Sequence, residues 1–141
     1  MANIVPDSFK QELFLAIHNF STSAGNTYKL ALYTTVTGFS ATGTTNYITT
    51  NEASGTGYSA GGTTLVNSTV TVAQNISFVS FNNATFSTAT LTASCCLIYN
   101  STQSNKAVVV LDFGGSKTST NGDFTIQFPT ANSTSAVLRI S

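Results

Sequence analysis

The chain has 141 residues, of which 41% are hydrophobic and only 7% charged, and five basic side chains balance five acidic ones. A chain of this length forms one domain that buries roughly 70% of the surface of its unfolded form, so the core needs no disulfide. Nucleic-acid and anionic-membrane binding both need a basic patch, and because no Lys/Arg cluster occurs we expect neither partner. The low charge fits a protein that ends in an assembly, and equally a weakly charged monomer.

Two further features bear on where the chain is made. The first ten residues, MANIVPDSFK, lack the basic and apolar regions of a secretion signal, and no apolar run is long enough to cross a membrane. Cys95 and Cys96 are adjacent in a strand pattern and should point to opposite faces, so a bond between them is not expected. Two free thiols indicate synthesis in a reducing cytoplasm.

The N-terminal region predicts one helix that ends around Asn19. Ser8 and Gln11 have the spacing of a capping box. A core-facing stripe follows at helical spacing, formed by Phe9, Leu13, Ala16, Ile17 and Phe20. Phe14 and Leu15 lie outside this stripe, so either the rest of the fold or a partner must cover them.

Strand patterns follow along residues 26–141. In residues 28–35 the side chains alternate between two faces, which predicts a first strand. Residues 36–64 form a loop longer than most, so we expect it to have a function or to contain short strands. Residues 65–73 and 76–81 predict two strands joined at Gln74 and Asn75. After a turn-rich link come strands over 123–128 and 136–140, the latter with Ala136, Leu138 and Ile140 inward.

The strongest strand signal is a hairpin of residues 91–99 and 107–113. Period-2 spacing predicts one buried face, formed by Leu91, Ala93, Cys95, Leu97 and Tyr99 with Ala107, Val109, Leu111 and Phe113. The opposite face is apolar enough to be partly covered as well. These elements predict a mainly β chain, an antiparallel β-sandwich or jelly-roll-like barrel with one N-terminal helix, in which residues 1–25 form an arm and helix and residues 26–141 the sandwich.

Patterns that could carry chemistry favour structural interpretations. The glycines between Gly55 and Gly62 precede a strand pattern instead of the helix that a dinucleotide site needs, and the segment from Gly114 to Thr118 fails as a phosphate loop for the same reason. His18, near the helix end, indicates a cap or surface role more than catalysis. One His, two adjacent Cys and five scattered acids supply neither a metal shell nor a carboxylate pair, so we expect no catalytic residue, metal or cofactor.

Asp112 is an acid inside an apolar strand, and we expect it to face a backbone donor, a Lys or solvent, because an unpaired buried carboxylate is too costly.

Four segments carry a family resemblance: DSFKQELFLAIHNF followed by YKLALYTT, then TNEASGTGYSAGGTTL, then CLIYN with KAVVVLDFGG, and lastly GDFTIQFP. Together they resemble a family of small proteins encoded among the virion structural genes of tailed bacteriophages. The resemblance covers most of the chain, and residues 52–65 are its most specific part. It implies a non-enzymatic virion component, with capsid cement or decoration as the first role and attachment at the neck, tail or fibre as the alternative.

The resemblance implies a location on the capsid surface, with two partners, the major capsid protein and further copies of this chain in a dimer or trimer. Oligomerisation would let weak individual contacts hold firmly. We expect the contacts in the N-terminal segment up to Phe20 or in loop 38–62, at Phe9, Leu13, Phe14, Leu15, Tyr47 and Tyr58. A carbohydrate- or receptor-binding module would instead use exposed aromatic side chains, for which Tyr33, Phe39, Tyr47 and Tyr58 are the candidates.

Overall fold

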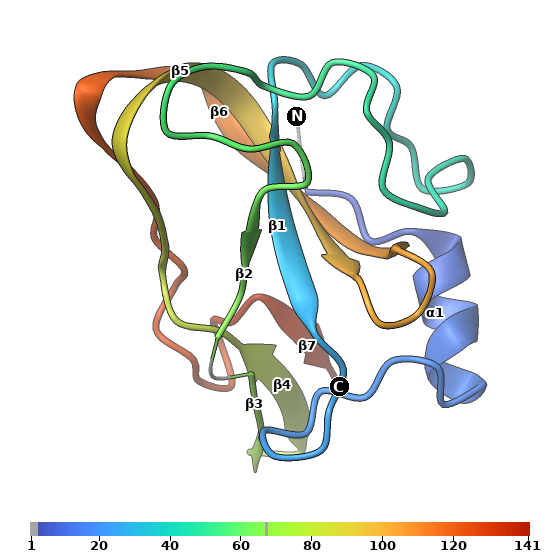
Figure 1. The fold of residues 1–141 in the computed structure, drawn as a ribbon. Helices are drawn as coiled ribbons and strands as arrows, with labels where there is room; N and C mark the ends of the chain where they lie inside the picture. Colours follow the sequence, from blue (N-terminus) through green and yellow to red (C-terminus); the bar gives the residue numbers. More distant parts are fainter. Residues whose placement is uncertain (1–2, 67) are drawn as a thin grey trace.

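Two antiparallel β-sheets and one short helix build the part of the chain that the computed structural model describes, residues 3–66 and 68–141 (Figure 1). The first sheet has the order β2 (Thr63–Thr64), β1 (Tyr28–Tyr33), β5 (Ala84–Asn100) and β6 (Lys106–Ile126). The second consists of β3 (Thr69–Ala73), β4 (Ile76–Ser80) and β7 (Leu138–Ile140). The predicted mainly β, sandwich-like fold is confirmed. Residues 1–2 of the predicted arm and residue 67 of the strand predicted over 65–73 lie outside the described residues.

The β5–β6 hairpin forms the centre of the first sheet, and apolar clusters cover both of its faces. β1 pairs with β5 from Tyr28 opposite Asn100 to Tyr33 opposite Cys95. The larger cluster includes Leu30, Cys96 and Ile98, with Val79 of β4 and Leu138 of β7 packed against it. The smaller cluster, on the other face, includes Tyr33, Phe39, Leu97 and Val110. The expectation that the central pair is covered on both sides is confirmed.

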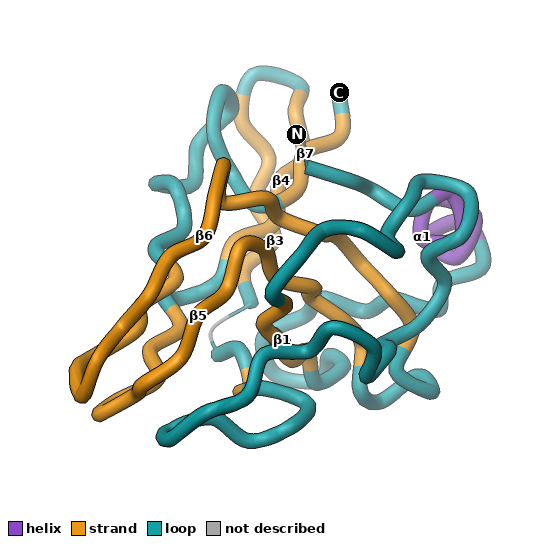
Figure 2. Tube along the Cα trace, turned by 90° about the horizontal axis from the view of Figure 1, so that it is seen from above, coloured by secondary structure: helices purple, strands orange, loops and turns teal. Residues whose placement is uncertain are grey.

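Both hairpin strands are longer than the sequence predicts. β6 runs through the predicted link after Phe113, because Gly114 and Gly115 adopt positive φ within a bulge. Ala93 pairs with Lys117 and Cys95 with Asp112, so four residues of β6, 113–116, lie opposite a single residue of β5, Ser94. Such bulges bend a strand pair, and Figure 2 shows the bend of this long ribbon on the opposite side of the molecule from α1.

The prediction that one face carries all odd-numbered residues of the hairpin is wrong. Leu91 and Ala93 join the larger cluster, whereas Cys95, Leu97 and Tyr99 join the smaller one. Ala107 is likewise separated from Val109, Leu111 and Phe113, which contact the larger cluster. Within the predicted hairpin the ladder shifts register between Ala93 and Cys95 and between Ile98 and Tyr99, and each shift changes which residues share a face.

The helix α1 (Asp7–Phe14) is shorter than predicted. The capping box is wrong, because Pro6 occupies the N-cap position without a side-chain bond and the Ser8 hydroxyl donates to the Thr44 carbonyl oxygen instead, at 3.2 Å. Beyond the helix, Ala16 has a φ of 56°, which a continuing helix does not allow. The chain then turns back, and the Phe20 ring stacks on Tyr28 with 4.4 Å between ring centroids.

The long loop before β2 covers the smaller cluster. Phe39 belongs to that cluster, and Tyr47 packs against it. Isolated bridges pair Asn46 with Lys106 and Glu52 with Tyr33, which ties the loop to the first sheet (Figure 1). The loop therefore serves as the second covering layer of the fold.

In the second sheet, β7 departs from the sequence prediction. Leu138 packs inward, but Ile140, which was also predicted to point inward, is exposed. Ile140 pairs with Ser77 of β4 and lies on the same face as Leu138, but the core does not cover this position.

Candidate functional site

Two strongly exposed apolar side chains lie next to each other at the end of α1. Phe14, the last residue of α1, has 94% of its surface accessible and Leu15, which follows it, has 63%, although Phe9 of the same helix is buried in the core. Of the residues predicted as assembly contacts, Phe9 is thus core and Leu13 is partly buried against it. Phe14 and Leu15 remain as an exposed pair, which we call the α1 tip.

A buried polar network holds α1 against the sheet. Glu12, which is itself buried, accepts a hydrogen bond from the Lys106 ammonium at 2.7 Å and contacts Nε2 of His18 at 2.8 Å. The Asn100 amide nitrogen contacts Nδ1 of His18 at 3.1 Å and donates to Oδ1 of Asn26 at 2.8 Å. These contacts join the helix to both strands of the central hairpin, so the α1 tip is presented on an anchored element.

The network fits a neutral His18. The Asn100 amide supplies a hydrogen to Nδ1, which leaves Nε2–H to donate to Glu12. Burial of the ring lowers the pKa of His18 below its ordinary value, and the Glu12 carboxylate only partly opposes this. In a charged imidazolium the N–H at Nδ1 would point at the Asn100 N–H, and two donors cannot form a hydrogen bond with each other. The predicted cap or surface role of His18 is therefore wrong, because contacts far apart in the sequence bury the residue.

A second polar cluster surrounds Glu52 and shapes the long loop. Its carboxylate accepts hydrogen bonds from the Tyr47 hydroxyl at 2.6 Å, the Tyr58 hydroxyl at 2.7 Å and the Gly61 amide at 2.6 Å. The Tyr58 hydroxyl also accepts from the Leu32 amide of β1 at 3.0 Å. Glu52 is the one charged residue between Lys29 and Lys106, a sequence signal that could have marked it as an internal anchor.

This cluster gives a physical reason for the residue pattern at 52–65. Gly62 has a φ of 73°, and a Cβ there would lie 1.8 Å from the Leu30 carbonyl oxygen, so the loop lies directly on β1. The glycines therefore serve a folded-back loop, as the sequence predicts, and no helix follows them.

The predicted contacts Tyr47 and Tyr58 are partly buried and take part in internal hydrogen bonds. The other two aromatic candidates also have internal roles. The Tyr33 hydroxyl donates to the Ile48 carbonyl oxygen at 2.6 Å, and the Tyr33 and Phe39 rings pack edge to face in the smaller cluster.

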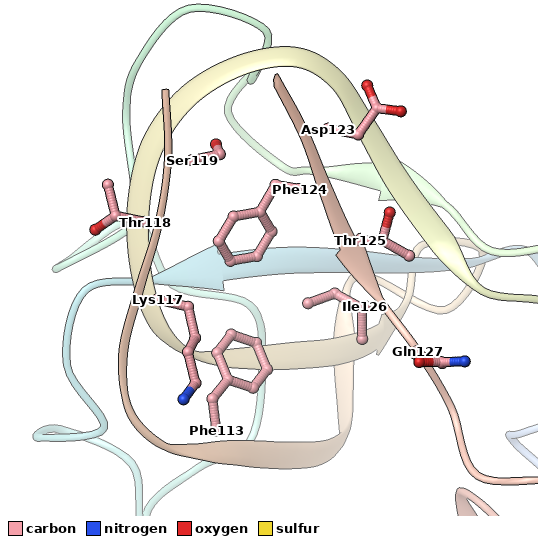
Figure 3. Close-up of a pocket in the computed structure, with 9 residues that line it drawn as sticks. All are labelled: Phe113, Lys117, Thr118, Ser119, Asp123, Phe124, Thr125, Ile126 and Gln127. Atoms are coloured by element: carbon pink, nitrogen blue, oxygen red, sulfur yellow. The ribbon is translucent and has the colours of Figure 1, made fainter. Parts of the chain in front are cut away.

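A groove of about 470 Å³ lies along β6, at the bend of the hairpin. Figure 3 shows the Phe113 and Phe124 rings and Ile126 within the arch of the ribbon, with Lys117 and Asp123 on different sides of it. The remaining lining residues are polar: Thr118, Ser119, Thr125 and Gln127. An apolar floor with a polar rim is typical of a binding surface. Residue periodicity does not reveal this groove, because bulges set the bend that forms it.

The remaining residues considered for chemistry have structural roles. Cys95 and Cys96 are free and lie in different clusters, as expected for adjacent strand residues, and burial raises the pKa of the Cys95 thiol to about 11. The Asp112 carboxylate accepts from the Gly114 amide at 2.9 Å, which lowers its pKa and confirms the expected backbone donor.

Within residues 3–66 and 68–141, no three His, Cys, Asp or Glu side chains gather as a metal site would require. No helix in this part of the chain is long and apolar enough to span a membrane.

The fold and the exposed surfaces place the chain in the class of small, mainly β proteins with two antiparallel sheets. Comparisons with known protein families, with characterised proteins and with solved structures found no match.

The Glu52 cluster predicts a large effect of one uncharged substitution. In Glu52→Gln an amide NH₂ replaces one acceptor oxygen and faces hydroxyl and amide donors, so we expect the free energy of unfolding to fall by about 1–3 kcal/mol. Denaturant unfolding measures this. Asp7→Asn removes an exposed carboxylate that pairs with the exposed Lys10 and should change stability by less than about 1 kcal/mol. Equal effects of the two substitutions would contradict an anchoring role for Glu52.

The His18 network predicts an acid-sensitive fold. Because the folded state lowers the pKa of His18, the unfolded chain binds the proton first as pH falls below the ordinary value of 6.5. Stability should therefore be full at pH values well above 6.5 and should decrease as the pH falls through and below that value, by at most about 1.4 kcal/mol per pH unit for one proton.

The control is His18→Gln, which removes the chain's one histidine. Thermal unfolding of this variant should show no comparable slope over the same pH range. If the variant keeps the slope of the unmodified chain, His18 is not its source.

Proposed function

We propose that this chain is a non-enzymatic structural protein of a tailed-phage virion, a capsid cement or decoration protein that binds the head shell as a homo-oligomer. The observation that carries the proposal is the α1 tip, an aromatic and an aliphatic side chain held in solvent on an anchored helix. The likeness of four sequence segments to phage virion proteins supplies the biological setting.

The α1 tip has the properties of a protein-binding anchor. Burying a Phe or Leu side chain gains about 1.5–3 kcal/mol, which is lost while the side chain remains in water. Aromatic anchors that fill a partner's pocket dominate many interfaces. A shell offers the same pocket at many equivalent positions, so one modest contact per copy suffices when the copies are linked.

The anchoring network supports this use. Ile4 exchanges backbone hydrogen bonds with Val110, and Glu12 pairs with Lys106, so both sides of α1 are tied to β6. A tip that is ordered before binding loses less conformational entropy in the complex. Deleting the N-terminal segment would also remove Phe9 and Phe20 from the core, so substitutions test the contact more cleanly than a truncation does.

The test is to count copies of the chain per virion, relative to the major capsid protein, by quantitative mass spectrometry of purified particles. A capsid role predicts a ratio near one or a simple fraction of it. The double substitution Phe14→Ser and Leu15→Ser should lower that occupancy at least about tenfold, because the anchoring contact is lost. Its melting temperature should stay unchanged.

Val66→Ser is the matched control, since Val66 is an exposed apolar residue far from α1 in the sequence. It should leave occupancy unchanged. Full occupancy of the Phe14 and Leu15 variant would contradict the contact, and a virion with only a few copies would contradict the shell location.

The groove along β6 favours a second candidate, a receptor-binding module at the neck, tail or fibre. A sugar ring has an apolar face that can pack on Phe113 and Phe124, and hydroxyls that can bond with Asp123, Gln127 and Lys117 at the rim. The partner class would then be a cell-surface saccharide.

For this second candidate, a glycan array and titration should detect binding that Phe113→Ala weakens at least about tenfold. Ile48→Ala, which changes an exposed apolar residue outside the groove, should bind as the unmodified chain does. An array without any bound glycan would contradict the saccharide function.

A further inference from the structure

A second exposed apolar surface lies on the three-stranded sheet. Val72 pairs with Ser77 and Ser77 with Ile140, while Val70 pairs with Val79 and Val79 with Leu138. Paired residues share a face, so all six lie on one side of the sheet. Val79 and Leu138 pack against the core, but Val70 is 56%, Val72 66% and Ile140 60% exposed.

The open edge of β3 lies beside this surface. In the sheet order β3 is terminal, and its outer side pairs with no strand in the described part of the chain. Natural edge strands are usually protected by a Lys, a proline or a bulge. β3 reads TVTVA and has none of these, since its pairing with β4 is regular from Thr69 to Ala73.

The hairpin turn fixes which backbone groups point outward. Gln74 and Asn75 both have positive φ, as in a two-residue turn that joins Ala73 to Ile76. In such a hairpin the flanking pair exchanges both backbone hydrogen bonds, and the pattern alternates along the ladder. Thr69, Thr71 and Ala73 therefore bond to β4, whereas the N–H and C=O groups of Val70 and Val72 point away from it.

The surroundings of this edge favour an identical strand as its partner. No charged residue occurs between Glu52 and Lys106, so two copies can approach without like-charge repulsion. Arg139 of β7 pairs with Phe78, which puts it on the opposite face, and it donates to the Ser133 carbonyl oxygen at 2.6 Å. The edge is therefore neutral and apolar on the side where Val70 and Val72 lie.

We propose that β3 pairs with β3 of a second copy across a twofold axis at Thr71, which makes one six-stranded antiparallel sheet. In this register Val70 lies opposite Val72 of the other copy, and the outward groups of these residues form four backbone hydrogen bonds. The same register places valine against valine on the exposed face, the self-complementarity that a twofold interface requires. This inference rests on the proposed homo-oligomeric state and assigns its interface.

The experiment is sedimentation equilibrium of the full chain over about 1 to 100 µM, which spans the range expected for a small interface. The unmodified chain should form a dimer. Val72→Lys places a charge at the edge, and Val72→Pro removes an outward N–H that β4 does not use. Each should raise the dimer dissociation constant at least about tenfold.

Two controls are needed. One tests whether added charge alone weakens the dimer, and the other tests whether the copies associate through the exposed face instead of through the β3 edge. Val66→Lys makes the same change outside β3, and Ile140→Lys changes the exposed face at the far strand; both should remain dimeric. A monomeric unmodified chain, or dimers of unchanged affinity in both Val72 variants, would overturn the proposal. So would an Ile140→Lys variant that dissociates as strongly as Val72→Lys.

The same measurements distinguish this proposal from the proposed function. Dimerisation in solution needs no virion, and the Phe14 and Leu15 substitutions should leave it unchanged. A monomeric chain whose Val72→Lys variant is lost from virions would mean that a strand of another virion protein occupies the edge, which overturns self-pairing while the virion role stands.

Discussion

The central hairpin is apolar on both faces, and the rest of the fold follows from the need to cover both. The second sheet, α1 and Phe20 cover one face. The chain has no third sheet among its described residues, so irregular backbone between β1 and β2 covers the other. Irregular backbone near a core leaves polar groups that need partners. Glu52, with two tyrosine hydroxyls and the Gly61 amide, satisfies this requirement.

The low charge content follows from the same constraint. Glu12, Lys106 and Glu52 all act inside the fold, where each joins segments that secondary structure alone would not hold together. Few charges remain for the surface, and the stretch from β2 to β5 has none. Composition thus reflects how this chain is built. It also leaves β3, an open edge of the second sheet, without the charges that usually keep such edges apart.

The sequence was sufficient for the mainly β class, the central hairpin and the presence of the N-terminal helix, because these depend on local periodicity. It did not predict which residues share a face of the hairpin. Val108 is one extra residue in β6, and four residues of β6 lie opposite Ser94, so the alternation of side chains between the two faces changes at both places. It also missed the burial of His18, whose partner Asn100 is 82 residues away. The helical stripe correctly separated Phe9, which is buried, from Phe14 and Leu15, which lie outside the stripe and are exposed.

The α1 tip and the β3 edge are distinct surfaces, and their separation has a functional consequence. A dimer formed through β3 leaves both α1 tips free, because α1 packs against β6 of the first sheet and β3 is the edge of the second. Two tips on one rigid body can engage two sites of a repeating shell, and the second contact then forms at a high effective concentration. A tip that binds weakly by itself is then enough to hold the dimer on the shell. Self-pairing and shell binding would therefore reinforce each other without any shared residue.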